Sequence, residues 1–397
     1  MEFSSNIASL QPSATMAVSA LAKQLRAQGR DVIDLSAGEP DFPTPSWIAE
    51  GGLEAVRTGR TRYTPAPGLP ELRQAVASDL SRRSRAGWSI SPDSVVVTAG
   101  AKQALWNACF ALFGPGDQVL IASPYWTSYP QMVGLCGADP VPVRGPEENG
   151  FKLRPEDLEA AAGPSTRGLI ICSPSNPTGT VYTLKELEAV AEWARDRGVW
   201  ILSDEIYRRI VFTGAGEDAP SLSDLPPSTL GPYVLVDGAS KCFAMTGWRI
   251  GYSVTEPEVA RKLAAFQSHT TSNAATPSQY AALRALSDPV RAQESIGNMV
   301  TAFLRRRNLM VEGFSRRLPG LTLVEPEGAF YLFFRVDGEY SKEVSDSQAW
   351  CSRVLETTGV ALVPGAAFGD DRYVRLSYAT SDDLLTEALR RLSEERE

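Results

Sequence analysis

The sequence predicts an α/β fold, with a large domain built on a mostly parallel β-sheet that helices cover on both faces, and a smaller α+β domain. Two observations support this fold class. Between residue 90 and about residue 290, short apolar runs alternate with stretches whose apolar residues recur at helical spacing. Beyond that point the alternation stops, and a long amphipathic stretch precedes further strand-like segments. At 397 residues the chain is long enough for about two domains.

Buried strands are expected where a run is apolar and β-branched without polar alternation, because both faces of a parallel sheet are covered. Five segments fit: SVVVTAG (94–100), QVLIAS (118–123), GLIICS (168–173), VWILSDE (199–205) and YVLVDGAS (233–240). Helices are expected between them, for example over 101–113 and 183–198. In such a sheet, ligands bind beyond the carboxyl ends of the strands.

The smaller domain is expected at the end of the chain. A long amphipathic helix is predicted over 292–318, followed by strands around LTLVEP, AFYLFFRV and YVRLSYAT. We expect residues 1–45 to join this domain, so that the chain divides into an N-terminal segment (1–45), a large domain (46–290) and a small domain (291–397).

Composition excludes several classes of protein. The net charge of −8 and the pI of about 5.1 argue against a nucleic-acid partner, because phosphate binding needs a basic surface. No segment holds about 20 uninterrupted apolar residues, and the first residues lack the pattern of an export signal, so neither a membrane span nor secretion is expected.

Cysteine and histidine usage narrows the chemistry. The five cysteines are scattered and never form CxxC, which favours reduced thiols and a cytoplasmic location. His269 is the only histidine, so a serine or cysteine triad and a histidine-rich zinc site are both unlikely, and no metal is expected. Catalysis would depend on lysine, carboxylates, tyrosine or a cofactor.

Polar and aromatic side chains gather at the expected carboxyl ends of the strands. Each lies within a few positions of a strand end, which predicts one shared ligand site: Gly100, Lys102, Trp126, Asn176, Asp204, Tyr207 and Lys241.

Seven motifs occur in an order that resembles one enzyme family: AGEPDF, RYTPAPG, AGAKQAL, PYWTSY, SPSNPTG, SDEIY and SKCFAMTGWRIGY. From residue 12 to residue 380 the chain is similar to the pyridoxal-phosphate-dependent aminotransferases of the aspartate aminotransferase superfamily, and within it to the bacterial aspartate/prephenate subgroup. The resemblance implies the family fold with a seven-stranded large-domain sheet, pyridoxal phosphate as cofactor, and transfer of an amino group between an amino acid and a 2-oxo acid by a ping-pong mechanism.

The resemblance also implies cofactor contacts. Lys241 matches the lysine that binds the cofactor covalently, and a nearby cation such as Arg249 would help to lower its pKa. Arg249 matches the phosphate-binding arginine, although a buried salt bridge is the competing role. Asp204 would hold the pyridine nitrogen protonated, and Tyr207 and Asn176 would bind the ring hydroxyl.

The remaining cofactor contacts follow from the same resemblance. The Gly100–Ala101–Lys102 segment, where a strand gives way to a helix, offers free amides to a phosphate. Trp126 would stack on the ring, although a core role stays open. Gly238 stands where many relatives have a phosphate-binding serine, and Ser240 is the expected substitute.

Substrate contacts are implied as well. Arg375 matches the arginine that grips the substrate α-carboxylate, with Gly38, Asn176 and Trp126 beside it. Lys102 and Thr15 match residues that meet a distal carboxylate, which favours aspartate or glutamate; a solvent-exposed role for Lys102 stays open. Gln11 departs from the lysine common at its position.

Tyr63 and the segment QSHTTSN (267–273), which we interpret as a loop, match parts that relatives contribute to the neighbouring subunit, so a homodimer with shared sites is expected.

Two alternatives remain at this stage. A pyridoxal-phosphate enzyme acting by elimination, replacement, cyclisation or oxidation at the β or γ carbon would use the same scaffold. The cofactor-sensing half of a transcription regulator shares the fold, but it needs a DNA-binding domain, and the sequence offers no residues for one.

Overall fold

A seven-stranded sheet forms the centre of the computed structural model, which describes residues 4, 7, 10, 12–212 and 217–394. Its strand order is β2-β8-β7-β6-β5-β3-β4, and only β8 runs antiparallel to its neighbours. The sheet is therefore mainly parallel, as predicted. Its strands are β2 (Val95–Thr98), β3 (Gln118–Ser123), β4 (Asp139–Arg144), β5 (Thr166–Cys172), β6 (Trp200–Asp204), β7 (Tyr233–Gly238) and β8 (Gly251–Val254).

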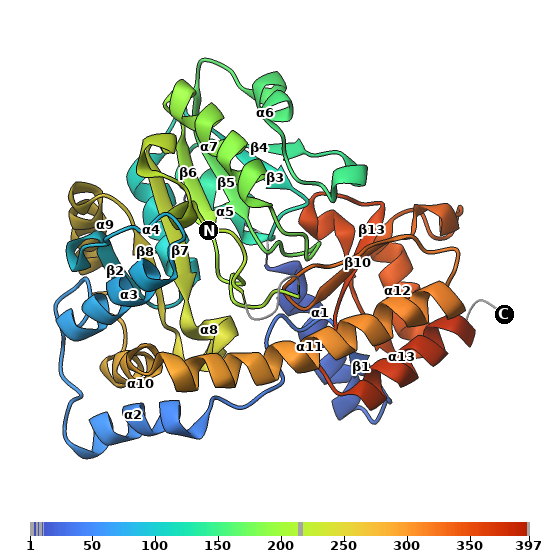
Figure 1. Cartoon of the computed structure of the whole chain (residues 1–397). Coiled ribbons are helices and arrows are strands. Elements are labelled where there is room, and N and C mark those ends of the chain that lie inside the picture. Colours follow the sequence, from blue (N-terminus) through green and yellow to red (C-terminus); the bar gives the residue numbers. More distant parts are fainter. Residues whose placement is uncertain (1–3, 5–6, 8–9, 11, 213–216, 395–397) are drawn as a thin grey trace.

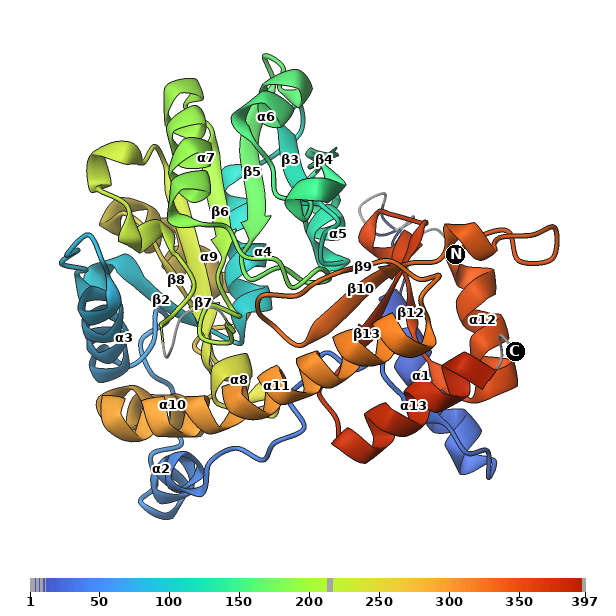
Figure 2. The same cartoon turned by 45° about the vertical axis from the view of Figure 1, so that its right-hand side comes forward.

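Helices cover both faces of this sheet (Figures 1 and 2). On β5, Ile170 packs in the same cluster as α4 (Ala101–Leu112), whereas Leu169 and Ile171 pack with α7 (Leu184–Arg197). Burial on both faces explains why this strand shows no polar alternation. The other helices of this region are α2 (Ser46–Arg57), α3 (Pro70–Arg83), α5 (Ser128–Leu135), α6 (Pro155–Ala161), α8 (Ala239–Cys242), α9 (Pro257–Thr270) and α10 (Thr276–Ser287).

A second region contains the smaller sheets. Its four-stranded sheet has the order β12-β13-β10-β9, and β1 pairs in parallel with β11. Its strands are β1 (Ile33–Asp34), β9 (Leu323–Val324), β10 (Tyr331–Arg335), β11 (Val360–Ala361), β12 (Val363–Pro364) and β13 (Tyr373–Ser377). Its helices are α1 (Ala14–Ala27), α11 (Pro289–Arg317), α12 (Ser347–Thr358) and α13 (Asp382–Glu394).

Pairing of β1 with β11 joins the N-terminal segment to the small region, in the way that the sequence suggested. The 29-residue helix α11 crosses the front of the molecule from α10 to α13 (Figure 2). It begins at Pro289, so it spans the predicted boundary between residues 290 and 291. The domain limits at 45/46 and 290/291 remain a prediction.

The structure corrects one interpretation and adds two strands to the large sheet. Residues 267–270 are the last turn of α9, so His269 lies on a helix and only the end of the QSHTTSN segment is non-helical. The sequence pattern did not predict this turn because a polar residue, Gln267, occupies a buried position of the helix. Its side-chain amide donates hydrogen bonds to the carbonyls of Ala66 and Val97, so no apolar residue is needed there. The sequence prediction also omitted β4 and the antiparallel β8.

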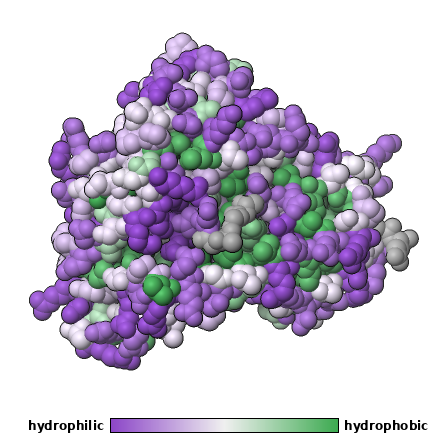
Figure 3. Space-filling view, in the orientation of Figure 1, coloured by the Kyte–Doolittle hydropathy of each residue, from purple (hydrophilic) through white to green (hydrophobic). Residues whose placement is uncertain are grey.

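Hydrophilic residues cover most of the face in Figure 3, with smaller apolar patches between them. Within the described part of the chain, no helix is both long enough and apolar enough to cross a bilayer.

Close packing of β8 against the start of α4 gives the first prediction. A Cβ on Gly251 would lie 2.2 Å from the backbone nitrogen of Ala101. Gly251→Ala should therefore lower the free energy of unfolding by about 1–3 kcal/mol, measured by urea denaturation. Gly163→Ala is the matched control, because a Cβ there meets nothing within 4 Å. Equal stability of the two variants would contradict the inferred contact.

Candidate active site

Lys241 projects from α8, the short helix that follows β7 directly. Its Nζ donates a hydrogen bond to the carbonyl oxygen of Gly38 at 2.5 Å and lies 5.8 Å from the Tyr207 ring centroid. Burial lowers the pKa of Lys241 to about 8; Arg375 and Arg249 also lower it, while Glu39 and Asp204 oppose the change. A substantial fraction of this amine is therefore neutral near physiological pH.

Asp204, the last residue of β6, places a buried carboxylate in the same space. The hydroxyl of Tyr129 on α5 donates to its Oδ2 at 2.7 Å, and the backbone N–H of Ile206 donates to its Oδ1 at 3.2 Å. Burial raises the pKa of Asp204, and these two hydrogen bonds work against the rise. Glu205 turns elsewhere and accepts from the Ser203 hydroxyl and the Leu222 amide.

The start of α4 brings backbone amides close to the guanidinium of Arg249. Gly100 precedes the first turn of α4 with φ +84°, and a Cβ there would lie 2.5 Å from Nη2 of Arg249. That guanidinium donates only to the carbonyls of Thr246 and Ala99, and no carboxylate among the described residues pairs with it. Free amides at a helix N-terminus beside an uncompensated cation suit a phosphate group. Ser240 lies one position before Lys241 on α8.

Arg375, in the middle of β13, is buried with 1% of its surface exposed. Its guanidinium donates to Oδ1 of Asn176 at 3.0 Å and to the Ser36 carbonyl at 2.8 Å, while its Nε has no partner. No carboxylate of the described chain neutralises it. Burial lowers the pKa of this guanidinium, because removal from water disfavours its charged form.

Aromatic side chains complete the walls. The hydroxyls of Tyr207 and Tyr331 lie 2.7 Å apart, and the Arg375 guanidinium lies 4.4 Å from the Tyr331 ring centroid. Nζ of Lys102 lies 4.8 Å from the Trp126 ring centroid. The side chain of Lys102 is exposed, and partial burial, followed by the charge of Arg249, lowers its pKa.

Contacts link most of the residues that the sequence singled out, but not all of them. Tyr63 is 91% exposed, and Thr15 on α1 forms no side-chain hydrogen bond to the other site residues in the described part of the chain. Gln11 lies outside the described residues.

Three residues of the site were missed by the sequence interpretation: Ser36, Tyr129 and Tyr331. Tyr129 belongs to the quoted PYWTSY motif, so its position was visible, but only the fold shows that its hydroxyl meets Asp204. Ser36 contributes a backbone carbonyl, which no residue pattern reveals.

Comparison with known proteins assigns the family. The model for "Aminotransferase class I and II" matches residues 30–392. The chain belongs to this family. It is 44% identical to an aspartate/prephenate aminotransferase of Cereibacter sphaeroides, over 98% of this chain and 97% of that protein. It is 43% identical to an aspartate aminotransferase of Geobacillus stearothermophilus, over 99% and 98% of the two chains.

The fold comparison agrees. The aspartate aminotransferase of Thermus thermophilus, solved with maleate, superposes with a TM-score of 0.92 at 40% identity and covers 99% of both chains. The resemblance inferred from the seven motifs is confirmed: the chain is an aminotransferase with the aspartate aminotransferase fold, and the family uses pyridoxal phosphate as its cofactor.

The charges around Lys241 give a prediction for this aminotransferase. In cofactor-free protein, reductive methylation of Lys241 followed by mass spectrometry should be half-maximal near pH 8, because the neutral amine is the reactive form. Arg375→Gln removes a neighbouring cation and should move this midpoint to higher pH. Glu39→Gln removes an anion and should move it to lower pH. Shifts in the same direction would contradict the electrostatic account.

Proposed function

We propose that this aminotransferase moves the amino group of a dicarboxylic amino acid, aspartate or glutamate, to a 2-oxo acid. The observation that carries the substrate class is a pair of cations that no carboxylate of the described chain neutralises: the buried Arg375, and the exposed Lys102 beside Trp126. A substrate with two carboxylates would compensate both. The relatives named aspartate aminotransferase, and the Thermus thermophilus enzyme solved with maleate, a dicarboxylate, support the same class.

The residues at the strand ends fit the cofactor. Gly100, Ala101 and Arg249 would hold its phosphate with help from Ser240, because this corner supplies amides and a free guanidinium. Asp204 would meet the ring nitrogen, where a buried carboxylate favours the protonated form. Tyr207 and Asn176 would bind the ring hydroxyl, and Trp126 would cover the ring face. When bound, pyridoxal phosphate supplies an aldehyde that amines attack and a ring that accepts an electron pair.

Lys241 would act twice. Its amine would hold the cofactor in the absence of substrate, and its free Nζ would take the α-proton from the substrate and return it at another carbon. A pKa of about 8 suits both duties, because such an amine exchanges protons readily near neutral pH. Two such half-reactions in succession give ping-pong kinetics.

Arg375 would orient the substrate. A guanidinium can meet two carboxylate oxygens at once, and Asn176 already restrains Nη1 from the side. The backbone of Gly38 would lie against the same carboxylate. Fixing the α-carboxylate decides which bond of the α-carbon faces the ring, and therefore which bond breaks. Thr15 and Lys102 would meet the distal carboxylate.

We further propose a homodimer whose subunits share their sites. Tyr63 is 91% exposed, which suits a side chain offered to a partner's phosphate site. The exposed Phe110 stacks on Phe266 with ring centroids 4.5 Å apart, so an aromatic pair lies at the surface and could pack against a partner. The molar mass in solution, measured by light scattering, tests this assembly.

A cytoplasmic location is proposed as well. All five cysteines are unbonded, and four of them are buried, as suits a reducing compartment. Cell fractionation with an antibody to the protein tests this.

The proposed activity is tested with purified protein. Aspartate should change the absorbance of the bound cofactor, and 2-oxoglutarate should restore it with formation of glutamate; Lys241→Ala should abolish both changes. Release of ammonia, or loss of a β or γ substituent without any need for a 2-oxo acid, would instead establish the alternative chemistry on this scaffold.

Lys102 provides a test of substrate class. Lys102→Ala should raise KM for aspartate about tenfold or more, because a charge-assisted contact to the distal carboxylate is lost. KM for alanine and phenylalanine, which lack that carboxylate, should change little. Lys262→Ala, at an exposed position on α9, is the matched control. An equal effect on all three substrates would remove Lys102 from the specificity site.

A further inference from the structure

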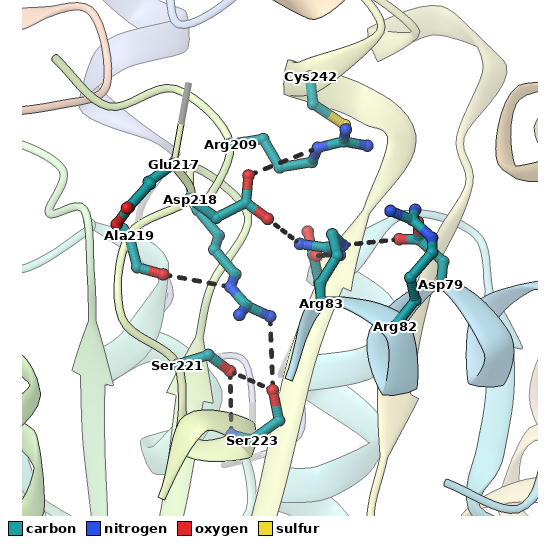
Figure 4. Close-up of polar contacts among 12 residues, drawn as sticks. Asp79, Arg82, Arg83, Arg209, Glu217, Asp218, Ala219, Ser221, Ser223 and Cys242 are labelled. Carbon is teal, nitrogen blue, oxygen red and sulfur yellow. Dashed lines mark hydrogen bonds and ion pairs between the residues drawn. The ribbon is translucent and has the colours of Figure 1, made fainter. Parts of the chain in front are cut away.

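A buried ionic cluster lies behind the segment that carries Lys241. We define this cluster as Asp79, Arg83, Arg209, Asp218 and Asp237. Figure 4 shows Arg83 between Asp79 and Asp218, with Arg209 on the other side of Asp218. None of these side chains takes part in the site described above.

Arg83 is the centre of this cluster. Its Nε lies 2.9 Å from Oδ2 of Asp79, its Nη1 lies 2.6 Å from Oδ2 of Asp218, and its Nη2 lies 3.9 Å from Oδ2 of Asp237. Only 8% of the Arg83 side chain is exposed, so these attractions are weakly screened by water. Arg209 reaches the cluster from beyond β6, with its Nε 3.8 Å from Oδ1 of Asp218.

Asp237 connects the cluster to the lysine turn, which we define as residues 238–242. Its Oδ1 accepts a hydrogen bond from the backbone N–H of Gly238 at 2.6 Å, and its Oδ2 accepts one from the hydroxyl of Tyr252 at 3.2 Å. Gly238 is the residue that immediately precedes α8. The carboxylate of Asp237 therefore holds the backbone from which the Lys241 helix starts.

The lysine turn lies between the ionic cluster and the candidate active site. A small internal cavity on the cluster side is lined by Arg83, Arg209, Asp237, Ala239 and Cys242, among others, and not by Lys241. Lys241 instead reaches the Gly38 carbonyl on the site side.

Packing leaves the start of this turn little freedom. A Cβ on Gly238 would lie 2.8 Å from both the Gly251 Cα and the Ile250 carbonyl oxygen. The Ala239 amide also donates to that carbonyl at 3.1 Å. A small displacement of Gly238 would therefore be passed to α8 and to the direction of the lysine side chain.

We propose that Asp237 is a positioning residue for Lys241: its carboxylate, kept in place by Arg83 and Tyr252, fixes the backbone at Gly238 and thereby aims the lysine amine into the site. The inference rests on the proposed role of Lys241 and goes beyond it, because it assigns a duty to residues that no substrate or cofactor would touch.

The charge of Asp237 is sensitive to pH. Burial raises its pKa to about 7, against the opposing influence of Arg83, the Gly238 amide and Arg208; Glu205 adds to the rise. The other titratable or charged groups around it are Asp79 from α3, Tyr252 from β8, Cys242 from α8, and Arg209. Protonation removes the attraction to Arg83 and weakens the acceptor that holds Gly238.

Two variants of the holoenzyme test the proposal. Asp237→Asn keeps the shape of the side chain but removes its charge. Asp218→Asn removes a carboxylate from the same arginine without touching the lysine turn, and it is the matched control. For Asp237→Asn we expect kcat to fall about tenfold, because the amine of Lys241 is misdirected. KM for the amino acid should stay within about twofold, because Arg375, which would bind the substrate carboxylate, is not displaced.

The pH profile separates positioning from general stability. In the wild type, kcat and the absorbance of the bound cofactor should each show a transition near pH 7 that Asp237→Asn lacks and Asp218→Asn retains. Tyr252→Phe, a milder variant, removes one hydrogen bond to the charged form and should move this transition to higher pH. A transition near pH 7 that persists in Asp237→Asn would overturn the proposal. If Asp237→Asn does not fold, a transition that is unchanged in Tyr252→Phe would overturn it instead. Equal losses of kcat in Asp237→Asn and Asp218→Asn would also overturn it.

Thermal unfolding gives a readout that does not depend on activity. Because the pKa of Asp237 is raised on folding, the folded protein binds more protons than the unfolded chain between about pH 4 and pH 7, and stability from this group is lost as the pH rises through 7. The Tm of Asp237→Asn should therefore rise relative to wild type from pH 5 to pH 8.

Asp218 behaves differently in this assay. Burial alone would raise its pKa, but Arg83, Arg209 and Arg208 lower it overall, so Asp218 stays ionised throughout this range. The Tm deficit of Asp218→Asn should be constant from pH 5 to pH 8. A Tm difference between Asp237→Asn and wild type that does not vary with pH would show that Asp237 does not titrate near 7 and would overturn the pH-dependent part of the proposal.

Borohydride reduction and mass mapping distinguish the two levels of inference. Failure to find cofactor on Lys241 of the wild type would overturn the proposed function and this inference together. Cofactor on Lys241, with identical pH responses in wild type and Asp237→Asn, would overturn only the role of Asp237.

Discussion

A guanidinium buried without a carboxylate constrains the whole site. Arg375 lies in the middle of β13, and its hydrogen-bond partners among the described residues are a side-chain amide and a backbone carbonyl, neither of which carries a charge. Removing such a cation from water is costly, and neutral acceptors compensate it incompletely. The fold tolerates this because Asn176, the Ser36 carbonyl and the Tyr331 ring surround it rigidly. The cost of burying this charge therefore stays partly uncompensated in the protein without a ligand, which is consistent with the carboxylate-binding role proposed above.

Burial shifts the pKa values of the acidic and basic groups of the candidate site in opposite directions, because it disfavours the charged form of each. It lowers the pKa of Lys241 and raises that of Asp204. The Tyr129 hydroxyl opposes the second shift, so a hydrogen bond from α5 helps to keep a carboxylate charged at the end of β6. At Asp237, behind α8, burial again raises the pKa of a carboxyl group. There the opposing partner is the charge of Arg83, whereas at Asp204 it is the hydroxyl of Tyr129.

Much of this arrangement is predictable from the sequence, because unbroken apolar runs place strands and the residues after them fall at one sheet edge. Gly100 and Lys241 follow, and Asp204 ends, strands that the structure contains within a few residues of the expected limits. Contacts between distant segments were not predictable: the Tyr129–Asp204 bond spans 75 positions, and that from Arg375 to Ser36 spans 339. The end of α9 was misread because Gln267 fills a buried helical position with a hydrogen-bonded amide.

The two-residue pairing of β1 with β11 has a consequence for the amino-terminal part of the chain. Ile33 and Asp34 are fixed beside Val360 and Ala361, and the backbone that leaves this pairing supplies the oxygens of Ser36 and Gly38 to Arg375 and Lys241. Ile33 and Leu35 also lie in the same apolar cluster as Ile170 and Leu202 of the central sheet. Shortening the chain through this stretch would therefore loosen the packing between the two regions and, at the same time, remove two acceptors from the candidate site.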